Sequence, residues 1–254
     1  MYDDFTFRAR HCAALGVHAF WGESGQTGAK LTRNLYELPG GWQAEIGAPS
    51  YPAWTRKLTL APVDGREMDA ELTRALLGWL CGAPDYLIAD DDRERMWLTR
   101  FDGGATLDNR TWPDGCLQIT ATIQGAAWGV RAQRWSGQTS GGVATIEARL
   151  DSQLPSPLGC AITCTSGTIT AMEIACAGHR LLLDGLSLAP GSEVRYSAGT
   201  GIAAPELIVD GMLDFGPVTR WAQIKLPPRA GRVHVALEGG EADVSVWARG
   251  RYLA

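Results

Sequence analysis

The sequence Arg66-Glu-Met-Asp-Ala-Glu-Leu-Thr-Arg-Ala-Leu-Leu-Gly-Trp-Leu80 has the spacing of an amphipathic helix. Its apolar residues recur every three or four positions and its charged residues fall between them, which predicts one apolar face over residues 66–80. The segments on both sides have strand patterns. A single amphipathic helix can bury its apolar face against one face of a sheet, so we expect a domain in which this helix packs on a sheet.

Strand patterns surround this helix in the first half of the chain. In the clearest of them, residues 116–123, apolar side chains alternate with glutamine and threonine, as in an antiparallel strand with one buried face. The charged stretch Asp90–Arg95 separates two further strand patterns and is typical of a solvated hairpin tip. The other predicted strands of this half are Phe5–Arg8, Lys57–Leu60, Tyr86–Ala89 and Arg95–Phe101.

Residues 19–51 differ from the rest, because glycine, serine, threonine and asparagine are frequent there and no strong periodicity is evident. The segment is too long for an ordinary loop of a compact domain. We therefore interpret it as an extended arm or hairpin that leaves its own domain and packs on another surface. The residues expected to make these assembly contacts are Trp21, Leu38, Pro39, Gly40, Gly41 and Trp42.

From about Val130 onward, short strand patterns follow one another closely and turn signals separate them. Many strands, frequent turns and no helix favour a β-sandwich or jelly roll. The stretch Trp135–Gly142 is interpreted as a loop, and the domain boundary is placed between Trp128 and Gly142. The predicted fold class is all-β with one helix, divided into an N-terminal domain of residues 1–132 and a C-terminal domain of residues 133–254.

Two dipeptides in the second half, Ser166-Gly167 and Gly239-Gly240, are interpreted as turns between separate strands. The strands expected around them are Cys160–Thr165, Thr168–Ala177, Val233–Leu237 and Asp243–Ala248. A further strand is expected at Trp221–Leu226. If it forms, Trp221 faces away from the core, and the same alternation predicts an outward-facing Trp247. Such aromatic residues mark either an interface or a ligand platform.

The composition restricts the classes of function. The net charge is −5, so nothing in the overall charge attracts nucleic acid or an anionic membrane. No uncharged stretch has the length of a membrane helix, and the polar N-terminus does not resemble a signal peptide. We therefore expect a protein made in the cytoplasm. Its six cysteines form no CxxC pair and are expected to be buried free thiols.

The sequence contains no pattern that predicts catalysis, and no metal or other cofactor is expected. There is no nucleophile elbow, phosphate-binding glycine loop or HExxH motif, and no carboxylate pair is brought together by its spacing. The adjacent His11 and Cys12 are a poor start for a metal site, because neighbouring residues of a strand point to opposite faces. The aspartates Asp90–Asp92 lack the spacing of a helix–loop–helix calcium site.

These patterns, in this order, resemble the distal tail protein (Dit) family of long-tailed, non-contractile phages. In the first half the resemblance is carried by Phe5-Thr-Phe7, the glycine turn Leu38–Gly41, the strand Arg56–Leu60, the helix end Leu77–Leu80, and the strand pair Tyr86–Asp90 and Trp97–Phe101. In the second half it is carried by Leu186–Gly191, Arg220–Pro228 and Trp247–Tyr252. It implies an N-terminal β-sandwich with one helix and a C-terminal galectin-like β-sandwich.

The resemblance also implies a function. Such a chain is expected to be a structural virion protein whose copies form a hexameric ring at the tail tip, assembled in the host cytoplasm. The ring would join the tail tube protein to the tail-tip or baseplate hub protein, and its C-terminal domains could carry receptor-binding proteins for host recognition. An acidic ring is expected to let DNA pass through its lumen without specific binding, because like charges repel.

Two other functions remain open. The chain could be a carbohydrate-binding module that grips host-surface glycans through its C-terminal β-sandwich, since galectin-like folds often stack sugars on an exposed tryptophan. In that case Trp221 or Trp247 would be the contact. It could also be an enzyme, which would require a pocket with converging titratable groups.

Overall fold

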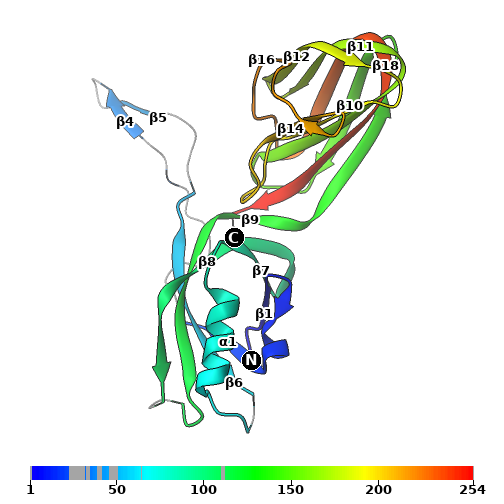
Figure 1. Cartoon of the computed structure of the whole chain (residues 1–254). Helices are drawn as coiled ribbons and strands as arrows, with labels where there is room; N and C mark the ends of the chain where they lie inside the picture. The colour runs from blue at the N-terminus through cyan, green and yellow to red at the C-terminus, as the bar shows by residue number, and fades with distance from the viewer. Residues whose placement is uncertain are drawn as a thin grey trace. The chain divides into compact units, whose positions relative to one another are not determined.

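The computed structural model describes residues 2–22, 32, 35–38, 42–45, 51–63, 65–109 and 112–253. The chain forms two compact units (Figure 1). The first unit runs to Val130 and includes Leu253, and the second comprises Arg131–Tyr252. None of the helices in the described residues is long and apolar enough to cross a membrane.

The first unit is an antiparallel sheet that carries one α-helix, α1. Its strands lie in the order β3-β6-β9-β8-β7-β1-β2. The first part of β9, up to residue 129, pairs with β6 on one side and with β8 on the other. The elements are β1 (Phe5–Phe7), β2 (Arg10–His11), the 3-10 helix η1 (Cys12–Leu15), β3 (Val17–Trp21), β6 (Trp54–Pro62), α1 (Ala70–Leu80), β7 (Asp85–Ala89), β8 (Asp92–Asp108) and β9 (Cys116–Gln138).

A separate two-stranded sheet lies in the predicted arm. It consists of β4 (Leu35–Leu38) and β5 (Trp42–Glu45), which pair antiparallel with Leu38 opposite Trp42. Among the described residues, these two strands pair only with each other. The turn residues Pro39, Gly40 and Gly41 lie outside the described residues.

Helix α1 begins four residues later than the periodicity predicts. Asp69 has an extended backbone, and its carboxylate accepts a hydrogen bond from the Leu72 N–H at 2.7 Å, so it is the N-cap of a helix that starts at Ala70. Before Asp69, the Met68 N–H donates to the Asp114 carbonyl at 2.8 Å, so the backbone of Met68 bonds to the segment that precedes β9 and not to the helix. The helix buries Leu72, Leu76, Trp79 and Leu80.

The end of α1 is fixed to the turn after β1. The Arg8 guanidinium donates to the carbonyl oxygens of Trp79 at 3.0 Å, Cys81 at 3.1 Å and Ala83 at 2.6 Å. The Trp79 indole N–H donates in turn to the Phe7 carbonyl at 2.9 Å. These bonds satisfy carbonyls that a helix end leaves without an internal partner, and they set a positive charge at the negative end of the helix dipole.

The second unit is built around two long strands that bend. These are β11 (Ser156–Cys176) and β18 (Arg229–Tyr252), which pair antiparallel along most of their lengths. The other elements are β10 (Val143–Leu150), β12 (His179–Leu188), β13 (Glu193–Ser197), β14 (Glu206–Val209), β15 (Met212–Leu213), β16 (Val218–Arg220) and β17 (Lys225–Leu226). The strand order places β13, β11, β18 and β9 side by side, while β10 pairs with β18 and β12 with β11.

The predicted turns at Ser166-Gly167 and Gly239-Gly240 are wrong, because the chain continues through both as a bulged strand. The pairing of β11 with β18 shifts register between Cys164 and Ser166 and again between Gly167 and Ala171. A Cβ atom on Gly239 would lie 2.3 Å from the Thr168 carbonyl oxygen, and one on Gly167 would lie 2.5 Å from the Gly239 carbonyl oxygen. Glycine is therefore required at these two positions, where the backbones of the paired strands approach each other closely.

Two other strand boundaries differ from the sequence prediction. The first half of the predicted loop Trp135–Gly142 is strand, since β9 extends to Gln138, and the turn to β10 lies at Gly141-Gly142. The predicted strand Trp221–Leu226 is paired only at Lys225–Leu226. All six cysteines are free and five of them are buried, as expected for small apolar side chains, whereas Cys81 is half-buried.

We expect Asp69→Ala to lower the free energy of unfolding by about 1 kcal/mol, because the first turn of α1 loses its cap. Urea unfolding of the full chain, followed by circular dichroism, measures the change. The matched control is Arg74→Ala at an exposed position of the same helix, where the expected change is within about 0.5 kcal/mol. Equal effects of the two substitutions would contradict the capping role.

Candidate functional site

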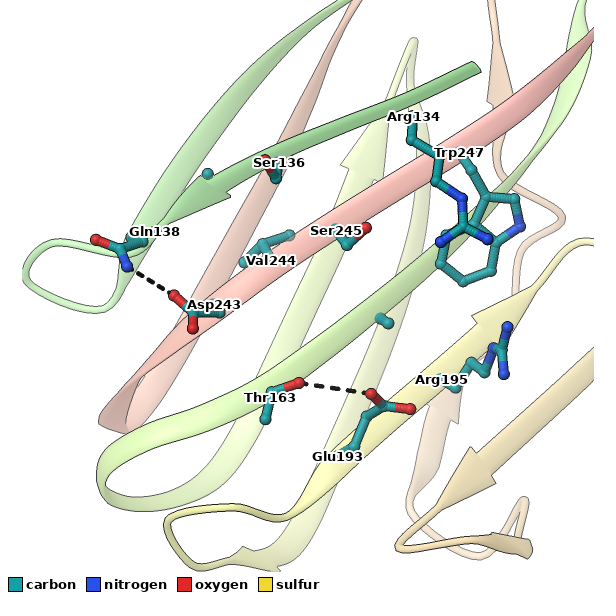
Figure 2. Close-up of a pocket in the computed structure, with 12 residues that line it drawn as sticks. Arg134, Ser136, Gln138, Thr163, Glu193, Arg195, Asp243, Val244, Ser245 and Trp247 are labelled. Atoms are coloured by element: carbon teal, nitrogen blue, oxygen red, sulfur yellow. Dashed lines mark hydrogen bonds between the residues drawn. The ribbon is translucent and has the colours of Figure 1, made fainter. Parts of the chain in front are cut away.

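A shallow groove of about 680 Å³ lies on the face of the second unit formed by β9, β18, β11 and β13 (Figure 2). Apart from Gly137 and Val244, its lining residues stand at alternate positions of these strands, so their side chains share one face of the sheet. They include Arg134, Ser136 and Gln138 of β9, Asp243, Ser245 and Trp247 of β18, Ala161 and Thr163 of β11, and Glu193 and Arg195 of β13. The groove has the volume typical of small-ligand sites.

Trp247 lies at one end of this groove. It pairs in register with Gly159 of the neighbouring strand. A Cβ atom on Gly159 would lie 2.1 Å from Cε2 and 2.2 Å from Nε1 of Trp247, so only glycine leaves room for the indole. The absence of a side chain at Gly159 therefore lets the ring lie across the adjacent strand, and Trp247 stays half-buried.

Two arginines converge on the same ring. The guanidinium carbon of Arg195 lies 5.3 Å from the centroid of the Trp247 ring, and that of Arg134 lies 5.7 Å from it. Figure 2 shows both guanidinium groups beside the indole. Both distances are within the range of a cation–π interaction. Among the described residues, no carboxylate forms an ion pair with either arginine.

The opposite end of the groove is acidic. Thr163 stands between Glu193 and Asp243 in one cross-strand row. The Gln138 amide donates to the Asp243 carboxylate at 2.8 Å, and the Thr163 hydroxyl donates to the Glu193 carboxylate at 3.5 Å (Figure 2). This row is four residues along β18 from Trp247, a separation of about 13 Å in an extended strand.

Trp221 has different surroundings. It is 39% exposed and makes edge contacts with Phe215 at 5.5 Å and Tyr196 at 5.6 Å between ring centroids. Phe215 is itself 45% exposed. Trp221 thus forms an exposed aromatic surface with Phe215, held by ring contacts rather than by the strand that the sequence predicts. Such a surface favours contact with another protein.

The chain after Trp221 is held by a buried tyrosine. The Tyr196 hydroxyl donates to the Ala222 carbonyl at 3.0 Å and accepts from the Ile224 N–H at 2.8 Å. Burial raises the pKa of Tyr196 to about 12, so the hydroxyl keeps its proton and both bonds at neutral pH.

The first unit contains a smaller groove of about 230 Å³ that includes Trp21. Its wall also contains Trp54 and Trp97, and the guanidinium carbon of Arg56 lies 5.4 Å from the centroid of the Trp21 ring. The Trp54 indole nitrogen is buried and has no hydrogen-bond partner within the part of the chain that the structure describes. Of the predicted assembly residues, Trp21 alone lies in this groove. Leu38 and Trp42 lie at the paired ends of β4 and β5.

Asp4, His11 and Cys12 form the candidate metal cluster, with ligand atoms within 4.8 Å of one another. The expectation that His11 and Cys12 point apart was wrong, because Cys12 begins a 3-10 helix and strand alternation ends there. His11 Nε2 lies 3.0 Å from an Asp90 carboxylate oxygen, and His11 Nδ1 accepts from the Ala13 N–H at 3.2 Å.

The other two groups of this cluster are also engaged. The Asp4 carboxylate accepts from the Ala19 N–H at 2.8 Å and lies 3.0 Å from His18 Nδ1. Burial raises the pKa of the Cys12 thiol to about 12, whereas a metal ligand must be the thiolate. The donor set therefore fits a metal poorly. We interpret it as a hydrogen-bond network that ties residues 2–4 and β2 to β3 and to the β7–β8 tip.

Solved structures resemble this chain, whereas no family model and no curated protein matches its sequence. The Dit protein of phage SPP1 (gp 19.1), described as a paradigm of the hub adsorption apparatus of phages that infect Gram-positive bacteria, matches with a TM-score of 0.70 and 11% identity, covering 100% of both chains. The chain has the Dit fold. A chain of the phage P2 baseplate, in its activated conformation with calcium, matches with a TM-score of 0.53 and 7% identity, covering 98% of both chains.

The Dit likeness confirms the predicted all-β class with one helix. The sequence analysis missed Arg134, Arg195 and Gly159, which shape the surroundings of Trp247. A signal for Arg134 was present, because Arg134, Ser136 and Gln138 are polar at alternate positions, as on the open face of a strand. The nearby Gly-Gly pair led to a loop interpretation instead.

The Asp4 network makes stability depend on pH. Burial raises the pKa of Asp4, but hydrogen bonds from Ala19 and His18 outweigh it and leave the pKa below the ordinary value of 3.8. The carboxylate therefore stabilises the fold fully above that value, and this contribution is lost as the pH falls below it through the folded-state pKa. We expect Asp4→Asn to flatten the fall in unfolding free energy below about pH 4.

Urea unfolding at a series of pH values tests this expectation. The control is Asp91→Asn, at an exposed position of the β7–β8 tip, which should keep the wild-type slope. If Asp4→Asn has the same acid dependence as the wild type, the network contributes nothing to it.

Proposed function

We propose that this chain is a ring-forming hub at the distal end of a phage tail. The observation that carries the proposal is the likeness to the SPP1 Dit protein, a hub protein, over the full length of both chains. The baseplate chain of phage P2, with the same fold, supports the same class of function. A match over both units favours the whole Dit role over that of an isolated binding module.

In this proposal the copies close into a hexameric ring in the virion tail tip. The ring joins the tail tube protein on one side to the tail-tip or baseplate hub protein on the other, and it carries receptor-binding proteins. Its work is to hold neighbouring proteins in place rather than to catalyse a reaction. In a closed ring, a neighbouring copy covers the contact surfaces of each subunit, so the assembly stops growing instead of aggregating without limit.

The groove of Trp21, Trp54 and Trp97 is our candidate for the contact between copies. It combines three aromatic side chains with a buried indole N–H that lacks an acceptor among the described residues. Tryptophan side chains often dominate the binding energy of protein interfaces.

We expect Trp21→Ala to shift the purified full-length chain from a hexamer toward monomer, because the rim of this groove is removed. Light scattering after size exclusion and negative-stain microscopy measure the change, with tail tube protein added if the chain alone is monomeric. The matched control is Val143→Ala, at an exposed apolar residue of the second unit, which should keep the wild-type mass.

Trp97→Ala provides a second test of the same surface. Circular dichroism of each variant separates loss of assembly from loss of folding. A folded Trp21→Ala and a folded Trp97→Ala that both assemble like the wild type would contradict the role of this groove. A wild type that stays monomeric with tail tube protein present would contradict the ring.

The assembled ring is expected to bind DNA weakly. Each chain has a net charge of −5, so a ring of identical chains repels phosphates unless cations are concentrated on its inner wall. Filter binding of duplex DNA at low salt should therefore show no retention. Tight binding that weakens steeply with added salt would indicate a basic lumen and overturn this expectation.

A further inference from the structure

We propose that the open edge of β10 binds an extended segment of another protein, which adds to the sheet of the second unit as an antiparallel strand. The segment carries an acidic side chain opposite Arg149 and a basic side chain opposite Glu147. The strand addition itself depends only on residues of the second unit. That the segment belongs to a neighbouring protein of the tail rests on the function proposed above.

Strand β10 lies at an edge of the second unit. Its residues, Val143–Leu150, pair with β18 and, among the strands that the structure describes, with no other. The pairing runs from Val143 opposite Ala236 to Leu150 opposite Arg229 without a change of register. The other side of β10 therefore presents a regular row of backbone groups, on which a further strand can form.

The hydrogen bonds at the start of β10 show which backbone groups face the open side. The Gly142 carbonyl accepts from the Leu237 N–H of β18 at 2.7 Å, whereas Val143 bonds to Ser140 through both its N–H and its carbonyl. Successive residues of an antiparallel strand alternate in this way. Every second residue after Val143 therefore directs its N–H and C=O away from β18, namely Thr145, Glu147 and Arg149.

Strand β10 lacks the features that usually prevent strand addition. It contains no proline and no bulge, and its inward-facing side chains are apolar and buried, namely Ala144, Ile146, Ala148 and Leu150. At the other edge of the same group of strands, β16 is three residues long, follows Pro217 and pairs irregularly with β12. The contrast favours β10 as the edge at which a partner pairs.

The exposed charges of β10 specify the side chains of the partner. The Glu147 carboxylate lies 3.3 Å from a guanidinium nitrogen of Arg232 on β18, whereas Arg149 forms no ion pair within the described residues. Opposite charges that face each other across two strands stabilise the pairing, and like charges destabilise it. A segment with an acid opposite Arg149 and a base opposite Glu147 is therefore favoured.

The inner-facing side chains of the added strand are expected to be apolar. Strand β9 passes close to β10 here, since a Cβ atom on Gly137 would lie 3.3 Å from Cγ1 of Ile146. Trp135, two residues earlier on the same face of β9, packs against the core and is only partly buried. Apolar side chains on the inner face of the added strand would extend the core at this margin.

A second copy of β10 is the competing occupant. Two antiparallel copies paired about Ala148 would also set Glu147 against Arg149. Such a contact is two-fold symmetric, whereas neighbours in a cyclic ring meet through two different surfaces. In a single ring at the end of a tail, β10 of each copy therefore stays open for a different protein.

Fluorescence anisotropy of labelled peptides, titrated with the full-length protein, tests the proposal. The matched probe is the blocked peptide Ser-Glu-Val-Lys-Val-Thr-Val-Ser, which sets its Glu opposite Arg149 and its Lys opposite Glu147. Two N-methylated forms separate strand addition from other binding. Methyl groups on the Lys and Thr amides, which face β10, should abolish binding, whereas methyl groups on the first two Val amides, which face away, should leave it unchanged.

The charge preference is tested with a second peptide that has Lys in place of Glu. We expect the wild type to bind the matched peptide about fivefold more tightly than this one. Arg149→Glu should reverse the preference. The matched control is Arg195→Glu, at an exposed position of β13 in the other group of strands, which should keep the wild-type preference.

Variants of the edge identify the site on the protein. Thr145→Pro removes an N–H that faces away from β18 and should abolish binding, whereas Thr145→Val keeps the N–H and should bind as the wild type does. Circular dichroism shows whether each variant is folded. Hydrogen exchange followed by mass spectrometry should show added protection in residues 143–150 when the matched peptide is bound.

Three results would overturn the proposal: no binding of the matched peptide, equal binding of its two N-methylated forms, or a doubling of the mass of the free protein that Thr145→Pro abolishes, since a second copy would then occupy the edge. The molar mass of each sample separates this inference from the ring. Six protomers without peptide binding would contradict strand addition alone. Peptide binding by a chain that stays monomeric with tail tube protein would contradict the ring alone.

Discussion

The first unit depends on the burial of α1, its one α-helix within the described residues, against the sheet. The contact is centred on Trp79, which stacks on Phe5 with ring centroids 5.4 Å apart and donates its N–H to the Phe7 carbonyl. Arg8 adds three hydrogen bonds to carbonyls at and beyond the helix end. Because a short helix is marginal in water, packing and end bonds rather than propensity hold α1 in place.

The second unit depends on glycines at the bends of β11 and β18. Beyond the register shifts the same two strands take different partners: the first part of β11 pairs with β13, and its last part pairs with β12. Two continuous strands thus contribute to both groups of strands in the sandwich. The outer face of the β13-β11-β18-β9 part stays open to solvent, and there the missing side chain of Gly159 makes room for Trp247.

Local periodicity predicted which helices and strands form better than it predicted the residues at which they begin and end. The alternation around Leu117 and the helical spacing around Leu76 are direct consequences of side-chain geometry, and the structure has both elements. Glycine pairs are ambiguous in sequence, because a tight turn and a bulge both need positive φ or close backbone approach. Gly141-Gly142 is a turn, but extending its loop back to Trp135 shortened β9 and hid Arg134 from its neighbours. The convergence of Arg134 and Arg195 on one ring is a property of strand order, which spacing alone does not encode.

The surroundings of Trp21, Trp221 and Trp247 distinguish binding roles that the sequence alone could not tell apart. Trp21 shares its groove with two other tryptophans, and the Arg56 guanidinium carbon lies 5.4 Å from the centroid of its ring. Trp221 is exposed and makes edge contacts with Phe215 and Tyr196. Of these three, Trp247 alone combines an indole held over a glycine, two convergent cations and a distant acidic row. Stacking area is common to all three sites, so it is the charge and hydrogen-bonding groups around the ring that decide what each can bind.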